Sequence, residues 1–188
     1  MANTINATSG VGIVSTADNT NELILQTNGT NAVSIDSSQN VSFAQTLALG
    51  VSNTLMELTL SAAAETVTIA AISATGTVNF DVSTQSILYY TSNASANWTL
   101  NIRGSSSVAL NSIMSTGQSV TVTHLVTQGG TAYYNSAVTV DGTSVTPKWS
   151  GGTAPSAGNA SSVDVYTYTL IKTGSGSFTV FASQTRYA

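Results

Sequence analysis

The chain has 188 residues and a formal net charge of −4, with eight acidic residues, four basic residues, one histidine and no cysteine. The lack of cysteine excludes disulfides, thiolate nucleophiles and zinc–thiolate sites, and four basic residues are too few to neutralise a run of phosphates, so we expect no nucleic-acid partner. Charged residues make up 6% of the chain, against about 25% in an ordinary soluble domain. Neutral polar residues take the place of charged ones, because Thr, Ser and Asn occur 30, 28 and 15 times. The share of hydrophobic residues, 41%, is close to normal. This composition predicts a folded protein with a neutral polar surface.

The N-terminal residues do not resemble an export signal, and no apolar run is long enough to span a membrane. Residues 1–15 lack the basic segment and the apolar core that export requires. The longest apolar runs, such as 47–51, have four or five residues, whereas a helix needs about 18 to span a bilayer. We therefore expect no membrane partner, and assembly in the cytoplasm in which the protein is made.

Three short strand-like segments, 22–27, 32–36 and 41–47, precede a division of the chain near Gly50. So few short strands are only marginally stable unless another surface covers their apolar face. Residues 1–50 are therefore predicted to be an anchoring arm that also trimerises, because closed cyclic association buries apolar side chains symmetrically. The side chains expected to need this cover are Leu23, Leu25, Val33, Ile35 and Phe43.

The remainder, 51–188, alternates between apolar and polar residues with the period of two that is typical of half-buried strands. In Asn97–Arg103, for example, Trp98, Leu100 and Ile102 share one face. The Asp141-Gly142 pair between two apolar runs predicts a tight hairpin. The same alternation recurs in 77–82, 119–127, 163–172 and 177–187. We count about nine candidate strands and find no apolar pattern with helical periodicity. This predicts an all-β fold, specifically an antiparallel β-sandwich or jelly roll.

The sequence offers little for catalysis. His124 falls on the same strand face as Val120, Val122 and Val126, and a lone histidine on an apolar face is usually a core residue. The acidic residues are scattered, and Asp36 and Asp141 fit the needs of their turns. The loop that starts at Asp36 also lacks the glycine and the closing glutamate of an EF-hand. We expect no catalytic residue, no metal site and no cofactor, and hence no enzyme.

Tyrosines are the candidate contacts for a sugar, because exposed phenol rings stack on pyranose faces. The candidates are Tyr89, Tyr133 and Tyr166, each from a closely spaced pair of tyrosines. The alternative is that these rings pack in the core or against a neighbouring strand or subunit, and the sequence favours this alternative.

Two segments resemble virion proteins of bacteriophages. Residues 21–41, NELILQTNGTNAVSIDSSQNV, resemble a segment of tail-fibre and other virion structural proteins, especially of marine phages, where it forms short strands of a threefold-wound shaft or attachment arm. Within 145–172, the runs TPKWSGGTAPSAGN and VDVYTYTLIK resemble the closing turn and hairpin of β-sandwich domains in phage fibres and appendages.

The resemblance implies a non-enzymatic virion structural protein that attaches to capsid or tail proteins through residues 1–50. The chain has one arm and one head where a long fibre repeats its shaft, so a capsid decoration, a head fibre or a short tail-fibre adaptor is expected. The alternative is a carbohydrate-binding adhesin or receptor-binding tip that contacts a host surface glycan.

Overall fold

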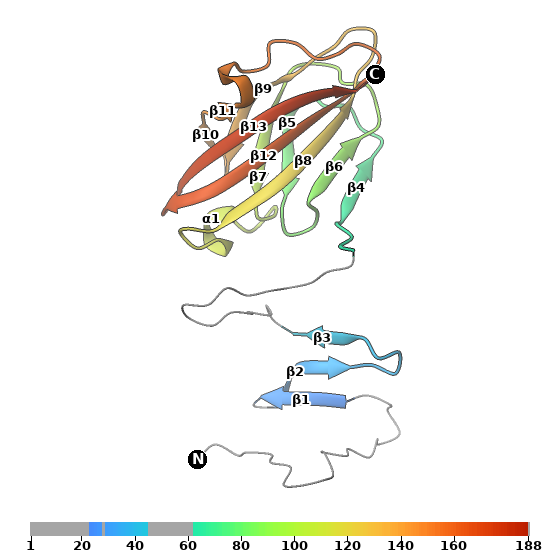
Figure 1. The fold of residues 1–188 in the computed structure, drawn as a ribbon, viewed down its shortest axis with the longest axis vertical. Coiled ribbons are helices and arrows are strands. Elements are labelled where there is room, and N and C mark those ends of the chain that lie inside the picture. Colours follow the sequence, from blue (N-terminus) through green and yellow to red (C-terminus); the bar gives the residue numbers. More distant parts are fainter. Residues whose placement is uncertain (1–22, 28, 45–61, 188) are drawn as a thin grey trace. The chain divides into compact units, whose positions relative to one another are not determined.

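The computed structural model describes residues 23–27, 29–44 and 62–187, and their regular structure is β-strand apart from two single helical turns. The expected all-β fold is confirmed. The chain divides into two compact units, Met1–Ser61 and Ala62–Ala188 (Figure 1). The division predicted near Gly50 falls in 45–61, outside the described residues. No helix among the described residues is long and apolar enough to cross a membrane.

The described residues of the first unit form an antiparallel sheet in the order β1-β2-β3. Its strands are β1 (Leu23–Thr27), β2 (Thr30–Ile35) and β3 (Val41–Phe43). Gly29 takes a φ of 74° in the turn between β1 and β2, a conformation that glycine adopts without a steric penalty. The Asp36 carboxylate accepts hydrogen bonds from the N–H groups of Ser38 (2.8 Å) and Asn40 (2.9 Å). Asp36 therefore stabilises the β2–β3 turn, as expected.

The second unit is a sandwich of two sheets, a four-stranded sheet in the order β10-β9-β7-β5 and a six-stranded sheet in the order β11-β13-β12-β8-β6-β4. The smaller sheet contains β5 (Gly76–Asp81), β7 (Trp98–Arg103), β9 (Asn135–Val140) and β10 (Thr143–Val145). The larger sheet contains β4 (Val67–Ala70), β6 (Ile87–Tyr90), β8 (Ser119–Thr127), β11 (Lys148–Trp149), β12 (Val163–Gly174) and β13 (Ser177–Tyr187). The two helical turns are α1 (Leu110–Ile113) and η1 (Ser150–Gly152).

Strand pairing differs between the two halves of this unit. The expected antiparallel pairs are present for β8–β12, β12–β13 and β9–β10. From β4 to β9, however, consecutive strands alternate between the two sheets, so that β4, β6 and β8 are mutually parallel in one sheet and β5, β7 and β9 in the other. The chain thus winds around the core in successive coils before the long β12–β13 hairpin extends the larger sheet (Figure 1).

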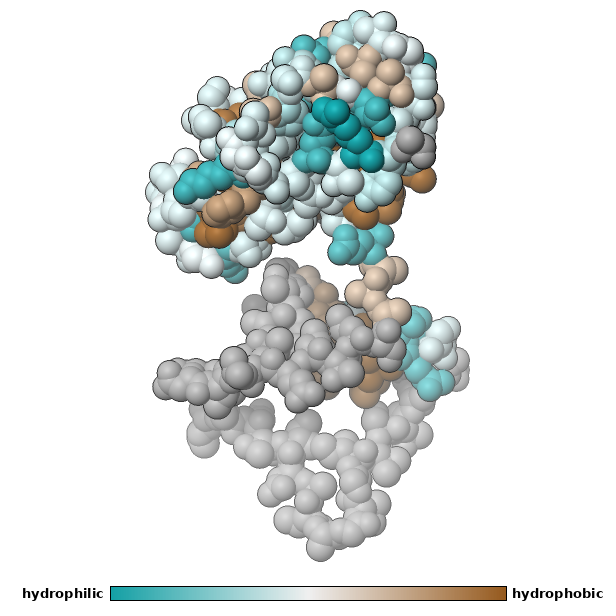
Figure 2. Space-filling view, turned by 45° about the horizontal axis from the view of Figure 1, so that its top comes forward, coloured by the Kyte–Doolittle hydropathy of each residue, from teal (hydrophilic) through white to brown (hydrophobic). Residues whose placement is uncertain are grey.

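The inner faces of both sheets form a single core. Alternate residues along the central strands are buried, including Phe80, Leu100, Val126 and Leu170, as period-two alternation predicts. The rings of Trp98 and Tyr166 meet edge to face with centroids 5.5 Å apart. On the face of this unit seen in Figure 2, residues of near-neutral hydropathy dominate, as the pale colours show, which agrees with the large share of Ser and Thr.

His124 lies inside this core, and its predicted core position is confirmed. Its side chain has no exposed surface, and its ring meets those of Tyr90 and Trp98 edge to face at 5.2 and 5.9 Å. Neither ring nitrogen has a hydrogen-bond partner. Burial without a partner disfavours the charged imidazolium and lowers the pKa of His124 to about 3.

Candidate functional site

The first candidate site is one face of the β1-β2-β3 sheet. Strand register places residues in rows across the sheet, and each row contains one residue from every strand. The two rows on this face are Leu23–Ile35–Val41 and Leu25–Val33–Phe43. All five side chains predicted for assembly therefore lie on one face, and Val41 joins them although the sequence analysis did not single it out. We call these six residues the arm face.

The described residues of the first unit leave the arm face partly exposed. Leu25 is 56% exposed, and Phe43 is 44% exposed. The opposite face carries the row Ile24–Ser34–Ser42, which is mainly polar. Burying an exposed leucine or phenylalanine completely stabilises a protein by about 1.5–3 kcal/mol. Covering six apolar side chains that are already partly shielded is therefore worth several kcal/mol per chain, enough to drive association.

The second uncovered surface is the outer face of the larger sheet where β4, β6, β8 and β12 are neighbours. Strand register aligns one apolar residue from each strand in the row Ile69–Tyr89–Leu125–Val165. Ile69 is 67% exposed, because β4 is the last strand of the sheet. Parallel strands are normally covered on both faces, so this row is a second surface suited to protein contacts.

The three tyrosines predicted as sugar contacts are not brought together. Tyr89 lies half-buried within the apolar row on the outer face. Tyr133 precedes β9 and packs partly against the core.

Tyr166 is completely buried, so its predicted glycan contact is wrong. Tyr166 and Tyr168 are two residues apart on β12, which places both rings on the inner face of the sheet. The Tyr166 hydroxyl accepts a hydrogen bond from Gln184 Nε2 at 3.0 Å, and burial raises the pKa of this phenol.

A buried polar clasp, which sequence reasoning missed, fastens the loops that follow β8 and β11. Gln128 Nε2 donates to Asp164 Oδ2 (3.0 Å) and to the Tyr133 carbonyl (2.7 Å). Asn159 N–H also donates to Asp164 Oδ2, at 3.1 Å. Burial raises the pKa of Asp164 above its ordinary value, and these hydrogen bonds oppose the rise. The clasp is directed inward, and its hydrogen bonds converge on Asp164 Oδ2, while the buried Asp164 Oδ1 has no hydrogen-bond partner.

Gly158 lies against this clasp, and Gly158→Ala should destabilise the protein by about 2 kcal/mol. A β-carbon at this position would lie 2.2 Å from the Tyr133 carbonyl oxygen and 2.7 Å from Asp164 Oδ2, so the loop would have to move. Chemical denaturation measures the change. Gly130→Ala is the control, because a β-carbon there meets nothing within 4 Å. Equal stabilities of the two variants would show that the clasp adapts freely.

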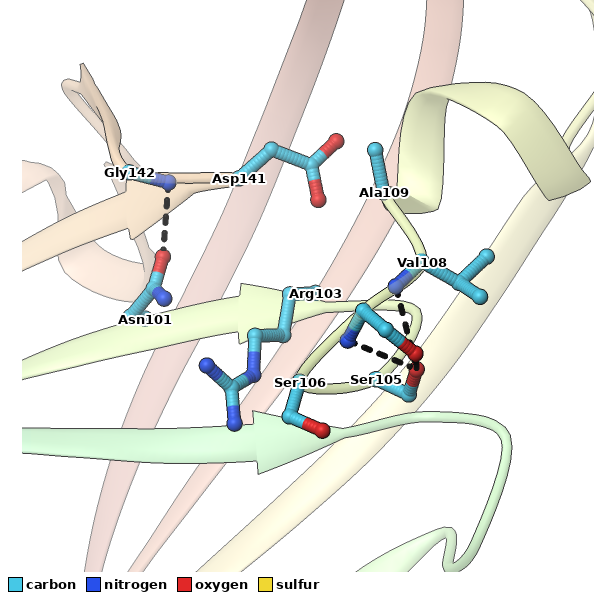
Figure 3. A pocket seen from close by; sticks show the side chains of 9 residues that line it. Asn101, Arg103, Ser105, Ser106, Val108, Ala109, Asp141 and Gly142 are labelled. Carbon is cyan, nitrogen blue, oxygen red and sulfur yellow. Dashed lines mark hydrogen bonds between the residues drawn. The ribbon is translucent and has the colours of Figure 1, made fainter.

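A shallow pocket of about 330 Å³ lies where β7 and β9 end, next to the Ser105–Ser107 turn (Figure 3). Its charged and amide side chains are already engaged by other protein groups. Arg103 Nε donates to Asp81 Oδ1 at 2.5 Å, and the Asp141 carboxylate accepts from Leu110 N–H (2.7 Å) at the start of α1. Gly142 N–H donates to Asn101 Oδ1 at 2.9 Å. The pocket is thus built by contacts that hold the sheet, the hairpin and α1 together.

Comparisons with known proteins give no relative. Family models, curated proteins and solved structures were all searched, and none matches this chain. Among the described residues, no three His, Cys, Asp or Glu side chains gather closely enough to hold a metal ion. The arm face and the outer apolar row of the larger sheet are the surfaces best suited to contacts with other proteins.

Proposed function

We propose that this protein is a non-enzymatic structural component of a phage virion, a surface appendage or decoration attached through its N-terminal arm. The observation that carries the proposal is the arm face, six apolar side chains on one side of a three-stranded sheet that the described residues of the first unit leave partly exposed. A sheet of this size needs a covering surface to be stable. The arm therefore gains its stability from other chains.

The proposed assembly is a homotrimer whose arms bury their faces around a threefold axis, with other capsid or tail proteins as further partners. The resemblance of residues 21–41 to threefold-wound phage arms supports this symmetry. The outer row Ile69–Tyr89–Leu125–Val165 supports further contacts through the second unit. The scarcity of charge also suits a particle component, because a surface solvated by hydroxyls and amides responds little to the salt concentration outside a cell.

A charge on the arm face should break the assembly. The double variant Leu25→Asp, Phe43→Asp places two carboxylates where the proposal buries apolar side chains, and an unpaired buried charge is strongly unfavourable. Light scattering should give about three times the 19.2 kDa mass of one chain for the wild type and a single-chain mass for the variant.

The matched control is Ser34→Asp, Ser42→Asp, which adds the same charge to the opposite face of the same sheet. This control should remain trimeric. A single-chain mass for the wild type at micromolar concentration would contradict the trimer. A trimeric Leu25→Asp, Phe43→Asp variant would show that the arm face is not the interface.

A further inference from the structure

A hollow of about 430 Å³ lies on the larger sheet where β11, β13 and β12 are neighbours. Strand register pairs Lys148 with Phe181, and the Lys148 ammonium lies 5.7 Å from the centre of the Phe181 ring. Phe181 is 44% exposed. The hollow thus combines a phenyl ring and an ammonium group with the hydroxyls of Ser150, Thr167, Thr169 and Ser183, and Trp149 and Ala182 complete its lining.

Three of these hydroxyls are available to a ligand. The Thr169 hydroxyl is engaged with that of Thr121 at 2.9 Å. Within the part of the chain that the structure describes, the side chains of Ser150, Thr167 and Ser183 form no hydrogen bond to protein groups. Hydroxyls both donate and accept, so they match the hydroxyls of a sugar. The volume lies in the range of small-molecule sites.

Lys148 differs from the other three cations of the chain. Arg103 pairs with Asp81, Lys172 donates to the Met114 carbonyl at 2.8 Å, and Arg186 donates to the Ala157 carbonyl at 3.0 Å. Lys148 forms no ion pair or hydrogen bond to any described residue, and no acidic side chain lines the hollow. An anionic group is therefore the complement that this site lacks.

We propose that this hollow binds an acidic saccharide. The anionic group of the sugar contacts the Lys148 ammonium, an apolar patch of the pyranose packs against Phe181, and Thr167 and Ser183 exchange hydrogen bonds with ring hydroxyls. The site depends neither on the arm face nor on trimerisation. One ammonium and one phenyl ring give weak binding, with a dissociation constant on the order of 1 mM, which multiple copies on a particle would strengthen.

The test is a calorimetric or NMR titration of the full chain with three probes, namely trigalacturonic acid, its methyl ester and a sulfated trisaccharide. The acid should bind at least 10-fold more tightly than the ester, which has the same shape without the charge. The sulfated probe shows whether the site accepts any anionic sugar or requires a carboxylate. Binding of the acid should weaken as salt rises, because the contact with Lys148 is exposed.

Variants assign the binding to the hollow. Lys148→Gln should lose at least 5-fold in affinity for the acid without affecting the ester, and Lys148→Arg should restore it. Phe181→Ser should weaken every probe. Tyr187→Ser is the matched control, because Tyr187 is an exposed aromatic residue of the same strand that lies outside the hollow, and it should change nothing.

Three outcomes would overturn the proposal: no binding of any probe at 20 mM, equal affinity for acid and ester, or unchanged binding by Lys148→Gln. None of these outcomes bears on the arm. The light-scattering experiment on the arm face can fail or succeed independently.

Discussion

Acidification from pH 7 to pH 4 should destabilise the wild-type protein by about 3 kcal/mol more than it destabilises the His124→Leu variant. The unfolded chain binds a proton at the ordinary histidine pKa of 6.5, whereas the buried imidazole binds it only near a pKa of about 3. Between pH 6.5 and pH 3, the histidine is therefore protonated in the unfolded state and neutral in the folded state. The stability contributed by the neutral buried ring is therefore complete above pH 6.5 and falls by about 1.4 kcal/mol per pH unit below it.

Leucine removes the titrating group and fills much of the same space among the rings of Tyr90 and Trp98. It also removes two buried nitrogens that have no partner, so the variant should be about as stable as the wild type at pH 7. Chemical denaturation at several pH values measures both proteins. His124 is the only histidine in the chain, and the carboxylates, including Asp164 with its raised pKa, are common to both proteins and cancel in the comparison. Parallel pH profiles would mean that the imidazole finds a proton acceptor or water inside the core.

Deletion of residues 1–61 should abolish assembly and leave the second unit folded. Every side chain of the buried core lies between Ala74 and Ala182, and both sheets of the sandwich are formed by strands that begin at Val67 or later. The melting temperature of the truncated protein should therefore differ from that of the full chain by less than about 4 °C, a shift that corresponds to about 1 kcal/mol or less. Light scattering should give the mass of a single truncated chain.

Near-ultraviolet circular dichroism provides the folding control, because Trp98 is packed against Tyr166 in the core. If the protein is the proposed virion component, virions assembled without it should bind the full chain and not the truncated one in co-sedimentation. Loss of the aromatic signal would show that the two units share a core. A truncated protein that still trimerises would transfer the interface to the outer face of the larger sheet, where Ile69 and Tyr89 lie side by side.

Local patterns in the sequence determined the strands and several of their turns. The period-two alternation predicted Ser119–Thr127 and Ser177–Tyr187, and β8 and β13 have these same bounds. Asp141 and Gly142 take φ angles of 51° and 79° in the predicted hairpin. The core position of His124 and the common face of Leu23 and Leu25 follow from the same alternation. These features depend on residues close together in the chain, so the sequence alone could show them.

Tertiary structure alone decided how the strands pair and which groups meet. β5 pairs in parallel with β7, so that Gly76 lies opposite Trp98, although β6, which comes between them in the sequence, belongs to the other sheet. Period-two alternation could not predict this, because it is the same for parallel and antiparallel neighbours. The Asp141 carboxylate reaches Leu110, 31 residues away, and the hollow beside Phe181 exists because β11 pairs with β13. Alternation shows which residues share a face of a strand. Whether the face of β12 that carries Tyr166 points into the core depends on the sheet that packs against it. These contacts form because the two sheets pack against each other. The free energy that stabilises this packing depends on residues from the whole unit, so no short segment of the sequence predicts it.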